Sequence, residues 1–283
     1  MIDTTIVVPC YNEASRLDGA AFRRFAAGNP HVGLLFVDDG SRDTTLDVLA
    51  GLRRGLERQV RIVSLPQNQG KAEAVRRGVL HVIDDRPPRA VGFWDADLAT
   101  PLEAIPVFRN VLYRRDDVSI VLGSRMPLLG RRIERRPLRR LLGRLFATAV
   151  RVTLGLPVFD TQCGAKMFRV TPMLRGIFAT RFASRWIFDV ELLARWLSTA
   201  ERPVDGLAGI YELPLDHWRD VAGSRLKGGD FLQAAADLSG IAWRYHRGHY
   251  RATAELPVPD PADVIPLPQA HADEPRQPGS KVA

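Results

Sequence analysis

Two aspartates, Asp95 and Asp97, follow the apolar segment 91–94 and are separated by one residue. If this segment is a buried strand, both carboxylates leave its end on the same side of an extended backbone. Two hard oxygen ligands suit Mg²⁺ or Mn²⁺, cations that keep water or phosphate oxygens as their other ligands. Two solvated loop acids are the alternative, because the Asp-x-Asp pattern alone is weak evidence. The pattern predicts a metal site that a nucleoside diphosphate would complete.

Short apolar segments alternate with helical patterns in the first half of the chain. We expect strands at residues 5–8, 32–37, 60–65, 90–94 and 119–122, and helices near 19–27, 44–56 and 72–82. This alternation predicts an α/β fold with a mainly parallel, mixed sheet and helices on both faces. Ligands of such sheets bind beyond the carboxyl ends of the strands. The polar clusters lie at four such ends, in residues 9–13, 38–41, 67–71 and 95–97.

The composition favours a globular enzyme. The chain has 283 residues, of which 46% are hydrophobic, and this is enough to fill a large core. It has no apolar run of about 18 to 20 residues and no signal-peptide pattern, so we expect a cytoplasmic protein. The two cysteines, Cys10 and Cys163, are too few for a disulfide framework.

The net charge of +8 is concentrated in one segment. Residues 131–151 contain eight arginines and one glutamate. From Pro137 to about Val152 the pattern is that of an amphipathic helix, with several arginines opposite an apolar stripe. The stripe consists of Leu138, Leu141, Leu142, Leu145, Phe146, Ala149 and Val152. Such a helix could lie on an anionic membrane surface, or it could cover the sheet with its arginines in solvent. We favour the membrane interpretation, on the cytoplasmic face, and expect no nucleic-acid partner.

A second helix is expected at about residues 230–245. From Glu255 onward there are seven prolines in 29 residues and no periodicity, which predicts disorder. We therefore expect one domain over residues 1–250, which includes the basic helix, and a Pro-rich disordered tail over 251–283.

Several motifs occur in a fixed order, and together they resemble the family 2 glycosyltransferases of the GT-A fold. They are Ile6-Val7-Val8-Pro9-Cys10-Tyr11-Asn12-Glu13, Val37-Asp38-Asp39-Gly40-Ser41, Asn68-Gln69-Gly70-Lys71 and Asp95-Ala96-Asp97. The segments 123–125 and 160–168, Trp218 and the segment 223–227 resemble the dolichyl-phosphate β-glucosyltransferase branch. The resemblance covers about residues 3 to 250 and implies a UDP-sugar donor, a divalent cation and a polyprenyl phosphate acceptor.

The resemblance also implies roles for single residues. Asp97 would be the main metal ligand and a catalytic residue, and Asp95 would touch the ion or the ribose. The donor nucleotide would be bound by Pro9, Tyr11, Glu13, Asp39, Lys71, Asp95, Arg225 and Lys227. Among them, Glu13 would accept a hydrogen bond from the ribose or the base, and Asp39 would accept one from the uracil N–H. For most of these residues, taken singly, a turn, a helix cap or solvated surface is the alternative.

The nature of the acceptor decides whether a general base is needed. A sugar hydroxyl must lose a proton as it attacks, whereas a phosphate monoester with a second pKa of about 6 is already mostly a dianion at neutral pH. A phosphate needs cations instead, and guanidinium groups match its oxygens. We assign Arg125, Arg136 and Arg140 to the phosphate group of the polyprenyl phosphate acceptor, together with Gln162 from the segment 160–168.

Asp189 occupies the position at which related enzymes with hydroxyl acceptors keep a catalytic carboxylate. Here it could orient the acceptor or the donor sugar, or it could belong to the polar face of a helix. We expect an inverting, metal-dependent transfer of glucose, or a similar hexose, from UDP to a polyprenyl phosphate. A glycan hydroxyl acceptor with Asp189 as base is the first alternative. A nucleotidyltransferase and a nonenzymatic basic module are the others.

Overall fold

The computed structural model describes residues 1–134, 137–200, 203–221, 229–248 and 250; for 137–140, 203–204 and 229–232 it describes the backbone alone. The predicted tail, Arg136, Arg225 and Lys227 lie outside the described residues. Arg140 is described only by its backbone. The predicted division into one domain and a tail therefore stays a prediction.

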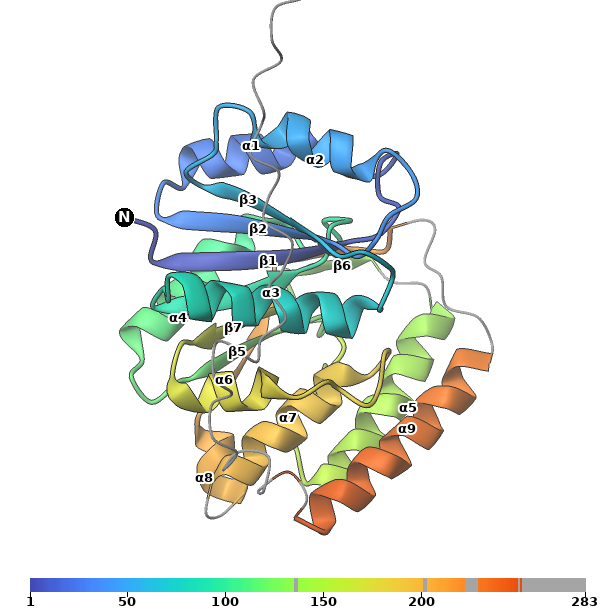
Figure 1. The fold of residues 1–283 in the computed structure, drawn as a ribbon. Coiled ribbons are helices and arrows are strands. Elements are labelled where there is room, and N and C mark those ends of the chain that lie inside the picture. The colour runs from blue at the N-terminus through green and yellow to red at the C-terminus, as the bar shows by residue number, and fades with distance from the viewer. Residues whose placement is uncertain (135–136, 201–202, 222–228, 249, 251–283) are drawn as a thin grey trace, which may run out of the picture.

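A mixed seven-stranded sheet forms the centre of the molecule (Figure 1), in the order β3-β2-β1-β4-β7-β5-β8. β7 is antiparallel to both neighbours, and every other pair is parallel. This confirms the predicted fold class. The strands are β1 (Thr4–Cys10), β2 (Val32–Asp38), β3 (Val60–Ser64), β4 (Ala90–Trp94), β5 (Ile120–Ser124), β7 (Ala165–Arg169) and β8 (Ile210–Pro214). A separate pair consists of β6 (Arg132–Glu134) and β9 (His217–Arg219).

Helices cover both faces of the sheet because alternate strand residues face opposite sides. Ile6 and Val8 belong to one hydrophobic cluster and Val7 to the other. The first cluster is covered by α1 (Gly19–Gly28), α2 (Thr45–Arg53) and α4 (Ala104–Arg114). The second is covered by α3 (Lys71–Asp85), α6 (Pro172–Ala179) and α7 (Phe188–Thr199). The short α8 (Pro203–Ala208) packs on α7.

The position of α3 depends on a glycine. A Cβ on Gly78 would overlap Val7 and would lie 2.8 Å from Val37 Cγ2, so only glycine lets the helix approach the sheet this closely. The close approach fixes the amino end of α3, and with it Lys71, at the carboxyl edge of β1 and β2. Gly78→Ala would move the helix outward.

Two long helices, α5 (Pro137–Leu154) and α9 (Gly229–His246), lie side by side beyond α7 (Figure 1). Thr153 carbonyl oxygen lies 2.8 Å from His246 Nε2, and α9 is tied to the loop before α7 by the hydrogen bond from Ser184 Oγ to Asp237 Oδ2, at 2.5 Å. Tyr250, just beyond α9, is buried in the second hydrophobic cluster, the one that α3, α6 and α7 cover. Its ring lies 5.9 Å from the Arg195 guanidinium. Burial, followed by the charge of Glu191, raises the pKa of Tyr250 to about 12.

The predicted apolar stripe of α5 is largely on the surface. Phe146 of the stripe is half-buried against the cluster that contains Leu238 and Ile241 of α9, whereas Val150 and Leu154, which are buried in this cluster, lie outside the predicted stripe. Three members of the predicted stripe instead face solvent: Leu141, Leu145 and Val152, which are 55%, 60% and 81% exposed. Among the described helices, none combines the length and the apolar character that a membrane-crossing segment needs.

Candidate active site

The loops after β1 and β2 are fastened together at the carboxyl edge of the sheet. The backbone N–H of Asn12 donates to Ser41 Oγ at 2.9 Å, and that of Glu13 donates to Thr45 Oγ1 at 2.8 Å. Pro9 and Tyr11 are half-buried on the β1 side of this junction. The convergence of these loops follows from the parallel pairing of β1 with β2.

Asp39 anchors the loop in front of α3. Its buried carboxylate accepts hydrogen bonds from Gln69 N (2.8 Å), Gly70 N (2.7 Å) and Asn68 Nδ2 (2.9 Å). Burial raises the pKa of Asp39, although the two backbone N–H groups act in the opposite direction. Asp39 thus has a clear local role, and its predicted contact with uracil stays a prediction.

Arg185 lies directly over that loop, a contact that sequence reasoning missed. Gly70 has φ +97°, and a Cβ there would lie 2.8 Å from Arg185 Nε. The Arg185 side chain also donates to Asn68 Oδ1 at 3.3 Å. Gly70 is therefore needed both for its backbone conformation and for the space that the guanidinium occupies.

Lys71 begins α3 and forms an ion pair with Asp95, with 2.5 Å between Nζ and Oδ1. Both side chains are partly exposed. Burial lowers the pKa of Lys71, but the charges of Asp95, Asp189 and Asp97 outweigh it, so the pKa is raised. Three of the predicted carboxylates therefore stabilise one ammonium group, and Asp95 is in direct contact with it.

Asp97 is the second acid of the segment Asp95-Ala96-Asp97. Its Oδ1 accepts a hydrogen bond from Ala99 N at 3.0 Å. Burial, and then the charge of Asp95, raises the pKa of Asp97, while Lys71 and Arg16 lower it. Arg16 itself forms a bidentate pair with Glu13, with a shortest distance of 2.6 Å. Glu13, predicted to accept from the ribose or base, therefore already holds an arginine.

The residues present fit a divalent cation that has other ligands from substrate and water. A divalent cation would relieve the repulsion between Asp95 and Asp97 that raises the pKa of Asp97. Gly164 leaves room for Asp95, because a Cβ there would overlap the carboxylate. Within the described residues, no group of three His, Cys, Asp or Glu side chains could enclose a metal. This donor set suits Mg²⁺ or Mn²⁺ bound with phosphate oxygens.

Arg125 is held in a buried ion pair. Its Nε and Nη2 donate to the two oxygens of Asp160, at 2.6 and 2.7 Å, and its guanidinium lies 5.2 Å from the Trp218 ring centre. Burial lowers the pKa of Arg125, but Asp160 outweighs this effect and raises it. Gln162, next to this pair, has a buried Nε2 that finds no hydrogen-bond partner among the described residues. The predicted acceptor roles of Arg125 and Gln162 stay predictions.

Asp189 lies in the first turn of α7 and forms a buried ion pair with Lys166 of β7, with 2.6 Å between Oδ1 and Nζ. The sequence did not indicate this pair, because Lys166 reads as an ordinary polar residue. The charge of Asp189 also raises the pKa of Lys71. Asp189 is 5% exposed and is therefore not on a solvated helix face, and its predicted role in the site stays a prediction.

Residues 5–175 match the sequence model of the family described as Glycosyl transferase family 2. The chain belongs to this family. It is therefore a family 2 glycosyltransferase, as the motifs predict.

Relatives of this glycosyltransferase cover most of its length. The dolichyl-phosphate beta-glucosyltransferase of Drosophila melanogaster is 33% identical over 271 residues, which are 88% of this chain and 77% of the relative. That of Saccharomyces cerevisiae is 30% identical over 268 residues, with 87% and 76% covered. A crystal structure of glucosyl-3-phosphoglycerate synthase from Mycobacterium tuberculosis, in complex with Mn²⁺, UDP-glucose and phosphoglyceric acid, has a TM-score of 0.63 at 20% identity, with 86% of this chain and 80% of that chain covered. This last likeness shows the fold.

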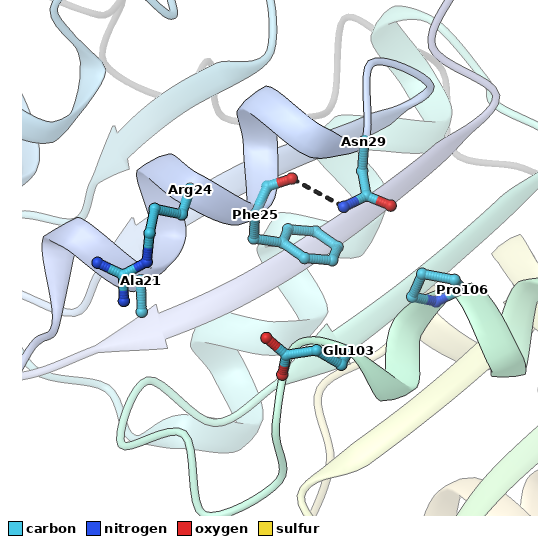
Figure 2. Close-up of a pocket in the computed structure, with 6 residues that line it drawn as sticks. All are labelled: Ala21, Arg24, Phe25, Asn29, Glu103 and Pro106. Atoms are coloured by element: carbon cyan, nitrogen blue, oxygen red, sulfur yellow. Dashed lines mark hydrogen bonds between the residues drawn. The ribbon is translucent and has the colours of Figure 1, made fainter.

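Two depressions lie on the surface of this glycosyltransferase. One, of about 320 Å³, separates α1 from the start of α4, with Phe25 and Asn29 on one wall and Glu103 and Pro106 on the other (Figure 2). It contains none of the predicted site residues. The other, of about 380 Å³, lies at the carboxyl ends of β2 and β3 and is lined in part by residues 38, 40–42 and 64–68. The second depression adjoins the loop that Asp39 anchors.

Proposed function

We propose that this glycosyltransferase transfers glucose, or a similar hexose, from UDP to a polyprenyl phosphate with inversion at the anomeric carbon. The names of its relatives support the acceptor and the sugar. The ligands of the M. tuberculosis structure support a UDP-sugar donor and a divalent cation. The single observation that carries the proposal is the cluster of Lys71, Asp95, Asp97 and Asp189 at the edge of the sheet.

This cluster is suited to a sugar diphosphate. Asp95 and Asp97 would hold Mg²⁺ or Mn²⁺, which supplies charge stabilisation to the departing diphosphate. Lys71 adds an ammonium group at the amino end of α3, where the helix dipole also attracts anions. A diphosphate that binds here would compete with Asp95 for the Lys71 ammonium.

In the proposed reaction, an oxygen of the acceptor phosphate attacks the anomeric carbon. The bond from that carbon to the UDP β-phosphate oxygen breaks, and its electron pair leaves with UDP. No proton has to be removed from a phosphate dianion. The pairing of Asp189 with Lys166 supports this acceptor, because the negative charge of Asp189 is already compensated. A hydroxyl acceptor with Asp189 as base remains the second candidate.

The acceptor cations are a separate part of the proposal. We assign Arg125, Arg136 and Arg140 to the phosphate, with Gln162 beside them. Since Arg125 already forms two hydrogen bonds with Asp160, it would contribute its charge more than its donors. The roles of Arg225 and Lys227 at the donor diphosphate also belong to the proposal.

We further propose that α5 and α9 rest on the cytoplasmic face of a membrane. Leu141, Leu145 and Val152 of α5 and Trp243 of α9 are all more than half exposed, and we call these four residues the α5–α9 apolar surface. Arg144 and Arg151 are exposed on the same helix. Apolar side chains beside arginines are typical of interfacial helices on anionic lipids. A lipid-linked acceptor would be reached from that surface.

The experiment is a turnover assay with purified protein, Mn²⁺ or Mg²⁺ and a panel of sugar nucleotides, with and without a short polyprenyl phosphate. We expect UDP release that depends on the polyprenyl phosphate and is lost in Asp97→Asn. UDP release at full rate without the lipid would contradict the acceptor. Release of pyrophosphate would favour a nucleotidyltransferase.

A further inference from the structure

Lys166 is a charged residue at the centre of the sheet. β7 lies between β4 and β5, and Lys166 is 0% exposed. Its neighbours Ala165 and Met167 face one hydrophobic cluster, so Lys166 shares the opposite face with Phe168. A lysine in such a position is costly unless its ammonium group is paired, because burial of a charge removes its hydration.

Three groups among the described residues lie next to the ammonium group of Lys166. It lies 2.6 Å from Asp189 Oδ1, donates to the Cys163 carbonyl oxygen at 2.8 Å and lies 5.4 Å from the centre of the Phe93 ring. Of these, only Asp189 carries a charge. Asp189 is 5% exposed, so this ion pair is screened little by solvent.

The pair continues into the candidate active site. Lys166 donates to Cys163, and the next residue, Gly164, lies directly against the Asp95 carboxylate. Asp95 is in turn paired with Lys71, so the buried pair adjoins the acids at the edge of the sheet.

We infer that Lys166 is a positioning residue for the transfer reaction. It holds Asp189 by Oδ1 and compensates its charge, so that Asp189 stays beside Lys71 at the place where donor sugar and acceptor meet. Lys166 itself touches no substrate. This inference rests on the proposed function, and it assigns the lysine a role that acts through Asp189 alone. A buried pair that serves only folding is the competing explanation.

The test is a double-mutant cycle with Lys166→Met, Asp189→Asn and the double variant, assayed with UDP-glucose and a short polyprenyl phosphate. We expect Asp189→Asn to lower kcat about tenfold with KM for the donor changed less than threefold. Lys166→Met should lower kcat by a similar factor. In the Asp189→Asn background, Lys166→Met should change kcat less than twofold, because the carboxylate through which Lys166 acts is no longer present.

Folding is controlled separately. Lys166→Met leaves a buried carboxylate uncompensated, so its thermal unfolding is compared with that of Lys166→Gln, which keeps a hydrogen-bond donor, and with the neutral double variant. If Lys166→Met does not fold, the comparison of Asp189→Asn with the double variant still decides. A double variant more than fivefold slower than Asp189→Asn, at equal stability, would overturn the inference.

Two further outcomes separate the inference from the proposed function. If Asp97→Asn abolishes UDP release while Asp189→Asn turns over like the natural chain, the proposed function stands and the inference fails. If Asp97→Asn leaves turnover unchanged, the proposed function fails first. A loss of more than about 100-fold in Asp189→Asn would instead indicate a general base and a hydroxyl acceptor.

Discussion

Gly164 lies against Asp95 so closely that any side chain at position 164 would displace the carboxylate. The contact continues in the backbone, where Asp95 N donates to Gly164 O at 3.2 Å. The end of β4 and the start of β7 thus fix the position of the Asp95 carboxylate, which we expect to face the metal. We expect a glycine at this position to be as important for the site as the aspartate itself.

Gly164→Ala tests this relationship. We expect the carboxylate of Asp95 to shift, with a loss of activity on the order of 100-fold, since about 1 Å of misplacement can cost this much. Binding of Mn²⁺ in the presence of UDP, measured by calorimetry, should weaken in parallel. Gly51→Ala is the matched control, because a Cβ on Gly51 meets nothing within 4 Å. Equal activity of the two variants would contradict the prediction.

Lys71→Met removes the ammonium group that pairs with Asp95. We expect weaker UDP binding by about tenfold or more, because a charge contact to the diphosphate is lost. Stability should change little, since a partly exposed ion pair contributes about 0 to 1 kcal/mol. Calorimetry with UDP and a thermal unfolding curve measure the two effects. A large fall in stability with intact UDP binding would assign Lys71 a structural role instead.

Asp97→Asn should make the protein more stable while it makes the enzyme inactive. Folding raises the pKa of Asp97, so the folded chain takes up the proton more readily than the unfolded chain. Ionisation at neutral pH therefore costs stability, and this cost disappears as the pH falls below the ordinary value of 3.8. A gain of about 1 kcal/mol would raise Tm by about 2 to 4 °C.

Thermal unfolding at pH 7 and at pH 3.5 measures this effect in the two chains without ligand. The increase in Tm should be present at pH 7 and absent at pH 3.5. A variant that is less stable at pH 7 would show that the Asp97 carboxylate contributes favourable contacts in the folded chain.

Arg125→Met should destabilise the fold by about 3 to 5 kcal/mol, because the buried carboxylate of Asp160 would lose the guanidinium group that pairs with it. The double variant with Asp160→Asn should recover part of this loss. Urea unfolding measures the free energies, and the fluorescence of Trp218, which lies beside the guanidinium, reports the local change. A loss below about 1 kcal/mol would show that the pair is dispensable for folding and free to serve the acceptor.

Leu145→Glu tests the α5–α9 apolar surface. We expect binding to vesicles that contain anionic lipid to weaken by about tenfold or more, because a fully buried leucine contributes about 1.5 to 3 kcal/mol. UDP binding and Tm should not change, as Leu145 lies outside the core. Leu46→Glu, at an exposed leucine of α2, is the control. Co-sedimentation with vesicles is the measurement, and equal binding of both variants would argue against membrane contact here.

The polar residues at the carboxyl edge of the sheet could be predicted, because the sequence patterns that indicate them are local. Each polar cluster directly follows an apolar strand, and parallel strands must end at the same edge. Lys71 and Asp95 were therefore expected close together, and the structure joins them. The family was predicted from the same local motifs.

The partners of several charged residues could not be predicted, because they come from distant parts of the chain. Arg125 reads as a free cation until Asp160 is placed beside it, and Lys166 reads as a surface residue until Asp189 is placed beside it. Arg185 gives no signal of its own contact with Gly70. Such pairs depend on how β7 and α7 pack, which hydrophobic periodicity does not encode.

The side of α5 that packs on the core could not be predicted for a similar reason. Periodicity gives the apolar side of a helix but not which residues another helix covers. Val150 and Leu154, which lie outside the predicted stripe, are buried, whereas Leu145 of the stripe is exposed.

The burial of Tyr250 has a practical consequence for the design of shortened chains. A chain truncated before Gly229 would lack α9 and Tyr250, and Val150 and Leu154 would become exposed. The same cut would remove Asp237, the acceptor for Ser184 in the segment that carries Arg185. A shortened chain that omits the proline-rich end should therefore retain Tyr250, so that this part of the core stays covered.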